Sequence, residues 1–179
     1  MGFQAVWDFW FEEIDSDQWR IKDPAFDELM VRRFSELHAS AVRCELYEWR
    51  QTPQGRLAEI IVLDQFSRNM FRGSAFSFAA DPLALALAQE AVAGGHDKAL
   101  TTRERGFLYM PYMHSESSLI HEEAVRLFKA NGVEETVDYE MRHKRIVDRF
   151  GRSPHRNAIL GRESTDEEIE FLKQPGSSF

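Results

Sequence analysis

A recurring helix-start signal constrains the fold more than any other feature of this sequence. Proline follows a residue that caps helix N-termini at Asp23-Pro24, Thr52-Pro53 and Asp81-Pro82, and an apolar run with helical spacing follows each pair. No run alternates apolar and polar residues for long enough to predict a β-strand. The sequence therefore predicts an all-α fold.

Two capping-box patterns and several glycine stops divide the chain into about eight helices joined by short loops. Thr101 with Glu104 forms one capping box, and Ser164 with Glu167 forms the other. Short connections make successive helices pack as antiparallel pairs. Periodicity alone fits a helical bundle and a short solenoid equally well.

The composition is that of a globular protein with a single core. With 179 residues, of which 43% are hydrophobic and 29% charged, the chain is long enough for one domain and short for two. No linker rich in Pro, Gly or Ser divides it, so we expect one domain over residues 1–179. The net charge of −8 argues against binding to nucleic acid or to a membrane surface.

Cysteine content and apolar runs favour the cytoplasm. Cys44 is the only cysteine, which excludes an intramolecular disulfide and a cysteine-based zinc cluster. No stretch approaches the roughly 20 apolar residues of a membrane span, and the first residues lack the basic flank and apolar run of a signal peptide. We therefore expect a cytoplasmic protein. The common nucleotide, hydrolase and metalloprotease motifs are absent from the sequence.

Arginine outnumbers lysine 17 to 5, which is the first indication of a site. Arginine is favoured over lysine where a cation is buried or binds a carboxylate or phosphate at two points. In the helical segment Leu57–Arg72, apolar residues cover nearly the whole circumference, so the polar residues there need a partner or a wet cavity. The candidate residues of this segment are Asp64, Gln65, Arg68, Asn69 and Arg72. They predict either a structural Asp64–Arg68 ion pair or the wall of a pocket for an anion.

A second polar cluster lies in the segment Tyr109–Glu116, which includes Tyr112. We expect Pro111 to break or kink its helix, so that His114 and Glu116 lie at a junction of helices. A histidine beside a carboxylate can act as a general base, and the alternative is a hydrogen-bonded junction that caps helices. The spacing matches no tight metal site, and we expect neither a metal nor a cofactor.

A third cluster follows residue 150, where Gly, Pro and Gly punctuate a basic segment. Its candidate residues are Arg152, His155, Arg156 and Asn157, with Arg162 beyond them. Pro154 could start a short helix whose N-terminal amides, together with the arginines, would suit an anion. The alternative is a chain crossing whose arginines cap helix C-termini. By contrast, His143 shares a helical face with Tyr139 and Ile146, which predicts a core or boundary histidine.

Seven segments, which include these clusters, together form a recognisable pattern. They are Asp8–Phe11, Leu63–Gly73, Tyr109–Glu116, Phe150–Arg152, Pro154–Asn157, Gly161–Thr165 and Ser177–Phe179. They resemble the bacterial family catalogued as domain of unknown function 924, over essentially the whole chain. The resemblance implies a helical, tetratricopeptide-like fold in a cytoplasmic bacterial protein, and it implies no established activity. Ser67 departs from the pattern, which has Pro there more often.

Three functions follow from these observations. The first is a binding or scaffold module with a pocket of Arg, His and Asn side chains for a peptide, a protein or a small anionic ligand. The second is an enzyme acting on a small anionic substrate, in which His114 with Glu116, or else His155, moves a proton beside the arginines. The third is a structural partner protein whose motif residues form buried ion pairs. The sequence does not predict the oligomeric state.

Overall fold

The computed structural model describes residues 1–178, which form helices and connecting loops without a β-strand. Phe179, the last residue of the family pattern, lies outside the described residues. The helices are α1 (Phe3–Asp8), α2 (Pro24–Val42), α3 (Pro53–Ile61), α4 (Ser67–Met70), α5 (Asp81–Ala93), α6 (Thr102–Met113), α7 (Ser118–Asn131), α8 (Glu134–Phe150) and α9 (Asp166–Leu172). Two π-helical turns extend α1 (Phe9–Glu13) and join α3 to α4 (Val62–Phe66).

These elements confirm the all-α prediction. With α3 and α4 counted as one helix across the π turn, residues 1–178 contain eight helices. A tetratricopeptide-like packing of these helices stays a prediction, as does the single domain. Within the described chain, no helix combines the length and apolar character that crossing a membrane requires.

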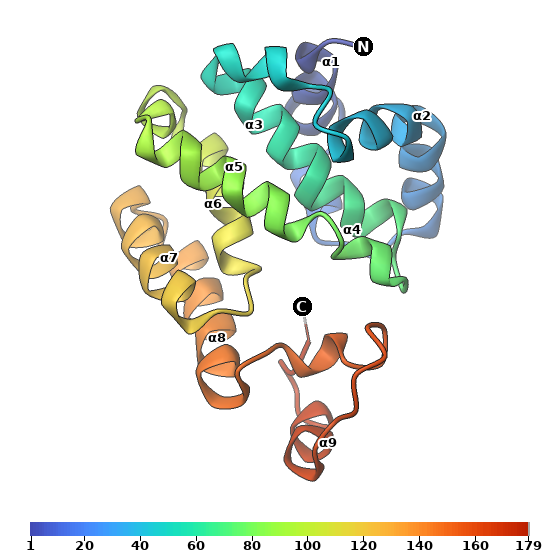
Figure 1. Ribbon diagram of the computed structural model, residues 1–179, viewed down its shortest axis with the longest axis vertical. Helices are drawn as coiled ribbons and strands as arrows, with labels where there is room; N and C mark the ends of the chain where they lie inside the picture. The colour runs from blue at the N-terminus through green and yellow to red at the C-terminus, as the bar shows by residue number, and fades with distance from the viewer. Residues whose placement is uncertain (179) are drawn as a thin grey trace.

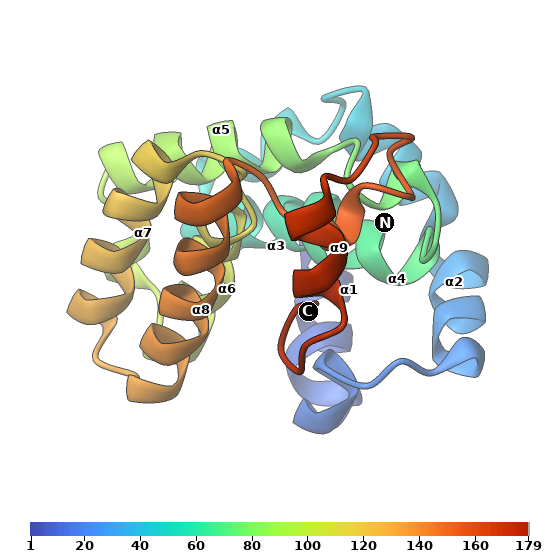
Figure 2. The ribbon, with the colours of Figure 1, turned by 90° about the horizontal axis from the view of Figure 1, so that it is seen from below.

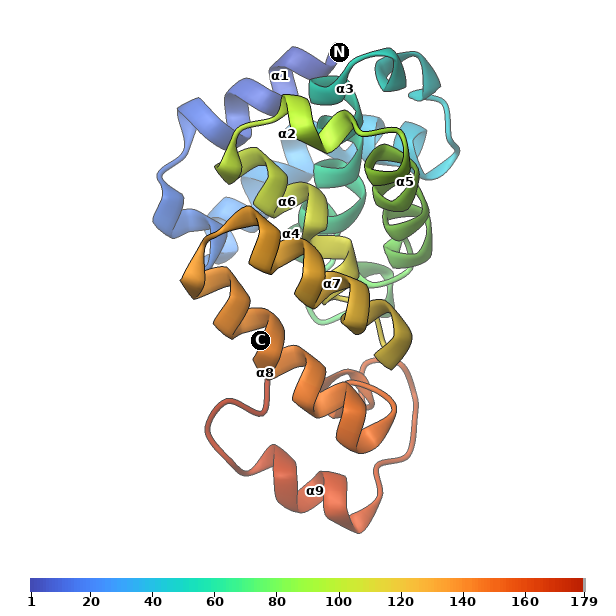
Figure 3. The ribbon, with the colours of Figure 1, turned by 90° about the vertical axis from the view of Figure 1, so that its left-hand side faces the viewer.

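Helix α3 lies at the centre of the arrangement, with α1, α5 and α6 packed against it (Figure 1). α6, α7 and α8 follow one another, each packed on the next (Figure 3). The chain then leaves α8 and forms a C-terminal segment, residues 151–178, which includes α9. Seen from below, this segment lies between α8 and α2 (Figure 2).

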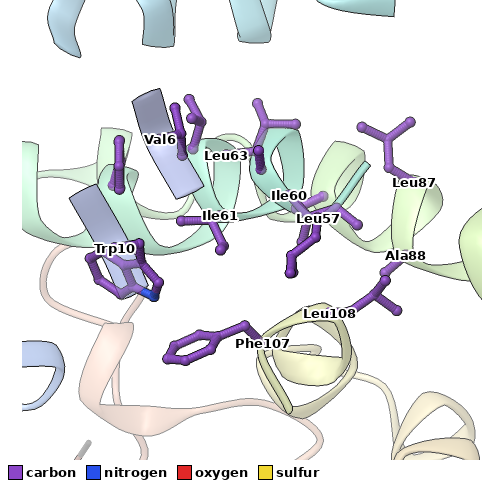
Figure 4. Close-up of a cluster of buried hydrophobic side chains, with 14 of the residues drawn as sticks. Val6, Trp10, Leu57, Ile60, Ile61, Leu63, Leu87, Ala88, Phe107 and Leu108 are labelled. Atoms are coloured by element: carbon purple, nitrogen blue, oxygen red, sulfur yellow. The ribbon is translucent and has the colours of Figure 1, made fainter. Parts of the chain in front are cut away.

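The core explains why α3 is apolar on almost every side. Its side chains point in several directions, toward α1 on one side and toward α5 and α6 on the others (Figure 4). Each large aliphatic side chain buried in this way stabilises the fold by about 1.5–3 kcal/mol. The residues labelled in this cluster are Val6, Trp10, Leu57, Ile60, Ile61, Leu63, Leu87, Ala88, Phe107 and Leu108, and all are 8% exposed or less.

Most predicted helix starts are present. The side chains of Asp23 and Thr52 each accept a hydrogen bond from a backbone N–H of the first turn of their helices, at 2.9 and 3.1 Å. Thr101 and Glu104 form both bonds of a capping box. Each bond satisfies one of the backbone donors that a helix N-terminus otherwise leaves unpaired.

The predicted position of the last capping box was wrong by one residue. Thr165 and Glu168 form the box, and α9 begins at Asp166. Ser164 does not cap the helix, because its hydroxyl accepts a hydrogen bond from Asn157 at 3.0 Å instead.

Two other boundaries also differ from the prediction. Asp81 is the first residue of α5 rather than its N-cap, which is Ala80, because the Asp81 carboxylate is bound by arginines from elsewhere in the chain. Pro111 does not break α6, which continues to Met113, so the junction with α7 follows two residues after the proline. A proline near a helix end removes one backbone hydrogen bond without ending the helix at once.

Candidate functional site

A cleft of about 510 Å³ opens where α4, the end of α6, α8 and the C-terminal segment meet. Its volume is in the usual range for small-molecule sites. Its polar lining residues are Arg20, Lys22, Gln65, Arg68, Asn69, Arg72, Ser77, His114, Thr136, Tyr139, His143, His155, Arg156 and Ser178. Its apolar lining residues include Trp19, Ile21, Phe78, Met110, Met113 and Ile159.

The Arg and Lys side chains of the lining are cationic, and each of the four arginines pairs with a carboxylate that lies outside the lining. Four arginines and one lysine line the cleft together with three histidines, and none of the described lining residues is an aspartate or a glutamate. A concave surface lined by one sign of charge attracts ligands of the other sign. The acidic residues behind the net charge of −8 that the structure describes therefore lie outside the lining of this cleft.

The π-helical turn Val62–Phe66 determines which side chains of the α3–α4 helix reach the cleft. A π turn inserts extra backbone into a helix, so the residues after it are rotated relative to those before it. Within the turn, Asp64 is only 1% exposed and Gln65 lines the cleft, as does Arg68 after the turn. Turns of this kind are frequent at functional sites.

Five residues form a closed ring of polar contacts beside the cleft. Arg68 Nη1 lies 3.0 Å from Asp64 Oδ1 and 2.9 Å from Asp81 Oδ1, and its Nη2 lies 3.0 Å from Asp81 Oδ2. Arg156 donates to Asp81 Oδ2 at 3.3 Å and to the backbone carbonyl of His114 at 2.9 Å. His114 Nδ1 closes the ring, 2.8 Å from Asp64 Oδ1. We call these five residues the charged ring.

The charged ring fixes the protonation of its carboxylate and its imidazole. Burial alone would raise the pKa of Asp64, but the charge of Arg68 and the contact with His114 hold it below its ordinary value. Burial lowers the pKa of His114, and the charge of Arg68 acts in the same direction. The imidazole is therefore neutral near pH 7. Because a carboxylate only accepts hydrogen bonds, the single proton of His114 lies on Nδ1.

Arg156 is the most buried cation of the charged ring. Its side chain is 7% exposed, and its Nε–H has no acceptor among the described residues. Its guanidinium lies over the ring of Phe78, 4.6 Å from the centroid, and Arg68 approaches the same ring at 5.7 Å. Burial, followed by repulsion from Arg68, lowers the pKa of Arg156. The two arginines share one carboxylate, that of Asp81.

The cleft brings together seven of the twelve predicted binding residues. They are Gln65, Arg68, Asn69, Arg72, His114, His155 and Arg156. Asp64 lies directly behind them in the charged ring. Asn69 and Arg72 both donate to the Asp27 carboxylate, at 2.9 and 2.6 Å. These two side chains of the cleft therefore already have an acidic partner. Tyr112 lies in the hydrophobic core instead, where burial raises its pKa to about 12.

The other predicted residues fasten the C-terminal segment. Arg162 donates to both oxygens of Glu116, at 2.7 and 2.9 Å. Arg152 donates to both oxygens of Glu168 at 2.7 Å, and Asn157 donates to the same carboxylate at 3.3 Å. Each guanidinium here is matched by a two-point carboxylate partner.

A second cavity of about 500 Å³ shares a wall with the cleft. Phe78, His114 and Arg156 line both, but the second cavity also has the carboxylates of Asp81 and Glu116 in its lining. The charge of the second cavity is therefore mixed.

Sequence reasoning missed one residue of the charged ring and several residues of the cleft. Asp81 was assigned to a helix cap, and His143 to the core or its boundary, although His143 lines the cleft with Nδ1 2.8 Å from the Tyr139 carbonyl. Arg20 and Lys22 were not singled out, and their only signal is their position in a loop beside aromatic residues. Within residues 1–178, no group of three or more His, Cys, Asp or Glu is arranged to hold a metal ion.

The known proteins that this chain resembles have no assigned function. A solved structure of a protein of unknown function from Agrobacterium tumefaciens is similar to this chain, with 40% sequence identity, 96% of each chain covered and a TM-score of 0.90. No curated protein matches the chain. The model of the bacterial family of unknown function DUF924 matches residues 6–176, and the chain belongs to that family, as its motifs predicted.

Proposed function

We propose that this protein binds a small anionic molecule with an apolar part in the cleft. The observation that carries the proposal is the lining itself, with five arginine and lysine side chains and no carboxylate among its described residues. The apolar lining, which includes Trp19, Phe78 and Met113, fits a hydrocarbon or aromatic group on the same ligand. The volume favours a small molecule over a peptide or a protein, and the net charge of −8 argues against nucleic acid.

The ion pairs of the charged ring are compatible with this role. The carboxylates of Asp64 and Asp81 are not among the lining residues, and Arg68 is. The Nε–H of Arg68 and the second hydrogen on Nη2 bond to none of the described residues. The carboxylates hold the guanidinium in place, and its remaining donors are available to an anion.

An enzymatic role is the second candidate, favoured by one observation. Asp64 orients the neutral imidazole of His114, and Nε2 makes no hydrogen bond to the described residues. A histidine oriented by a carboxylate is a typical general base. Glu116, expected as its partner, is instead bound by Arg162, so the pair that favours catalysis is Asp64 with His114.

The structural alternative fits the C-terminal segment better than the cleft. The Glu116–Arg162 and Arg152–Glu168 pairs leave no gap between cation and carboxylate, as a fastening contact requires. For the whole protein we infer a bacterial, cytoplasmic setting, from its family and from its single cysteine.

The test is isothermal titration with inorganic phosphate, with phenylacetate, and with benzyl alcohol, which has the same ring and no charge. Phosphate and phenylacetate should bind, phenylacetate at least tenfold more tightly than benzyl alcohol, and added salt should weaken both. Arg68→Met should weaken anion binding about tenfold or more, because a hydrogen bond to a charged group contributes about 1.5–3 kcal/mol.

Matched variants separate binding from folding. Arg43→Met also removes a two-point ion pair, but Arg43 lies outside both the cleft lining and the C-terminal segment, so this variant should leave anion affinity unchanged. Arg72→Met, at the exposed outer wall, should weaken binding by a few fold without unfolding the protein. Equal affinity for phenylacetate and benzyl alcohol, or no anion binding at millimolar concentration, would contradict the proposal.

A further inference from the structure

We propose that His114 makes the cleft selective for oxyanions that carry an O–H donor next to the charged group. This inference rests on the proposed function and names the ligand chemistry of the same site. Two sources share that chemistry, namely a carboxylate with a neighbouring hydroxyl and a phosphate that retains a proton.

The first step is the direction of the hydrogen bonds at His114. Asp64 is buried and ionised, so it accepts the Nδ1–H of His114 at 2.8 Å. In the neutral imidazole the other nitrogen then has a lone pair and no proton. Nε2 therefore accepts a hydrogen bond and cannot donate one. None of the described residues donates a hydrogen bond to Nε2, and His114 lines the cleft.

The second step is the character of its neighbours. Arg68 and Arg156 only donate hydrogen bonds, and both are joined to His114 within the charged ring. Arg68 shares Asp64 Oδ1 with His114, at 3.0 and 2.8 Å. Arg156 holds the backbone carbonyl of His114 at 2.9 Å. Two cationic donors and one neutral acceptor thus line one part of the cleft.

The third step is what such a set of groups recognises. An oxyanion satisfies the arginines, and only a ligand that also carries an O–H satisfies His114 Nε2. A ligand without that hydrogen leaves the acceptor without its water and without a replacement, which costs affinity. Sulfate and simple carboxylates fall in that class, whereas monohydrogen phosphate and α-hydroxy carboxylates do not. The apolar lining favours a ligand of the second kind that also has a hydrocarbon substituent.

Two pairs of probes test the selectivity, because the members of each pair are similar in shape and differ in the O–H donor. Mandelate and phenylacetate share a phenyl ring and a carboxylate, and only mandelate has the α-hydroxyl. Phosphate near pH 7 retains a proton, and sulfate does not. By titration calorimetry, one enantiomer of mandelate should bind about five- to tenfold more tightly than phenylacetate. The affinity for phosphate should be higher than the affinity for sulfate by a similar factor. The two pairs also show whether the hydroxy acid or the phosphate is the better match.

The variant that decides the matter is His114→Phe, which keeps a ring and removes the acceptor. Both affinity ratios should fall to about one, because mandelate loses its acceptor and phenylacetate no longer leaves an acceptor unsatisfied. Tyr139→Phe is the matched control, because it removes another polar atom from the cleft lining and should leave the ratios intact. If His114→Phe does not fold, the 15N spectrum of wild-type His114 supplies the test. Nε2 should be unprotonated at pH 7, and its resonance should shift with mandelate and not with phenylacetate.

The outcomes are distinguishable. If neither acid binds, the proposed function fails and the selectivity fails with it. If both bind with a ratio near one, or if the ratio survives in His114→Phe, the anion site stands and the role of His114 is overturned. A protonated Nε2 in the free protein also overturns it.

Discussion

Replacing Asp81 by asparagine should weaken the fold and strengthen anion binding at the same time. Asp81 is the carboxylate that Arg68 and Arg156 share, with contacts of 2.9, 3.0 and 3.3 Å. Asparagine keeps the shape, removes the charge and, with its oxygen in the place of Oδ2, turns an NH₂ group toward the guanidinium of Arg68. A stabilising ion pair is lost, and the cleft gains one unit of positive charge.

The magnitudes follow from the geometry. Breaking one partner out of a buried pair costs about 3–5 kcal/mol. Arg68 keeps Asp64, and Asp81 is still 17% exposed to water, so we expect the lower end, about 3 kcal/mol. A unit charge about 8 Å from a bound anion contributes about 2 kcal/mol at an effective dielectric constant near 20. Salt in an open cleft reduces this by about half, which leaves roughly a fivefold gain in affinity.

Urea unfolding and titration with phenylacetate measure the two effects separately. Glu135→Gln is the control, because Glu135 pairs with Arg20 at the exposed rim and should cost less than about 1 kcal/mol. The reasoning is refuted if Asp81→Asn retains wild-type stability. It is also refuted if the variant binds phenylacetate more weakly, because Asp81 would then act by orienting the arginines rather than through its charge.

Three further predictions concern stability. Burial raises the pKa of Glu140, whose Oε1 lies 2.7 Å from His121 Nδ1, so the folded protein holds this proton more tightly than the unfolded chain does. The stability that this proton contributes is present below about pH 4.5 and is lost as the pH rises through the raised pKa of Glu140. Glu140→Gln should therefore remove this pH dependence of the free energy of unfolding in urea. Glu140→Ala should lower that free energy by about 3 kcal/mol. The sign is opposite for Glu168, because its hydrogen bond with Arg152 lowers its pKa to about 2. The stability that ionised Glu168 contributes is complete above about pH 4.5 and is lost as the pH falls toward 2. Amide hydrogen exchange in residues 151–172, corrected for intrinsic rates, should therefore become faster in acid. In Glu168→Gln the exchange should already be faster at pH 7. Finally, Gly55→Ala would place a Cβ 2.1 Å from a backbone carbonyl oxygen of the preceding turn and should cost roughly 1–3 kcal/mol, an expectation that an unchanged urea midpoint would contradict.

Local rules were enough to predict most of the fold. An N-capping side chain, a proline in the first turn and an apolar stripe act within a few residues, so they can be read from the sequence at Asp23, Thr52 and Thr101. The same rule failed at Asp81. An aspartate before a proline fits a helix cap, but two arginines distant in the sequence bind this carboxylate more strongly than the first turn of α5 does.

The candidate site was predicted only in part, because tertiary contacts assemble it. The Arg68 and Arg156 segments stood out as arginine-rich polar clusters, and both line the cleft. A regular helix with 100° per residue places Asp64 and Arg68 on one arc. The sequence does not predict the π turn that contains Asp64, which is buried. His143 has an ordinary boundary pattern on α8, and only the C-terminal segment packed across from it makes a cleft there.

The ligand that we propose accounts for the charged ring better than stability alone does. A buried ion pair gains little over apolar residues of the same size, so a network kept only to hold helices together should at least satisfy its own members. The Arg152–Glu168 pair does so, because two short bonds join it and it leaves no buried side-chain polar atom without a partner among the described residues. The charged ring does not. Among the described residues, the Nε–H of Arg156 has no acceptor, and two N–H groups of Arg68 and Nε2 of His114 have no partner. Arg68 and His114 line the cleft, and their unused groups are donors and an acceptor of the kind that an oxyanion with a hydroxyl would engage together.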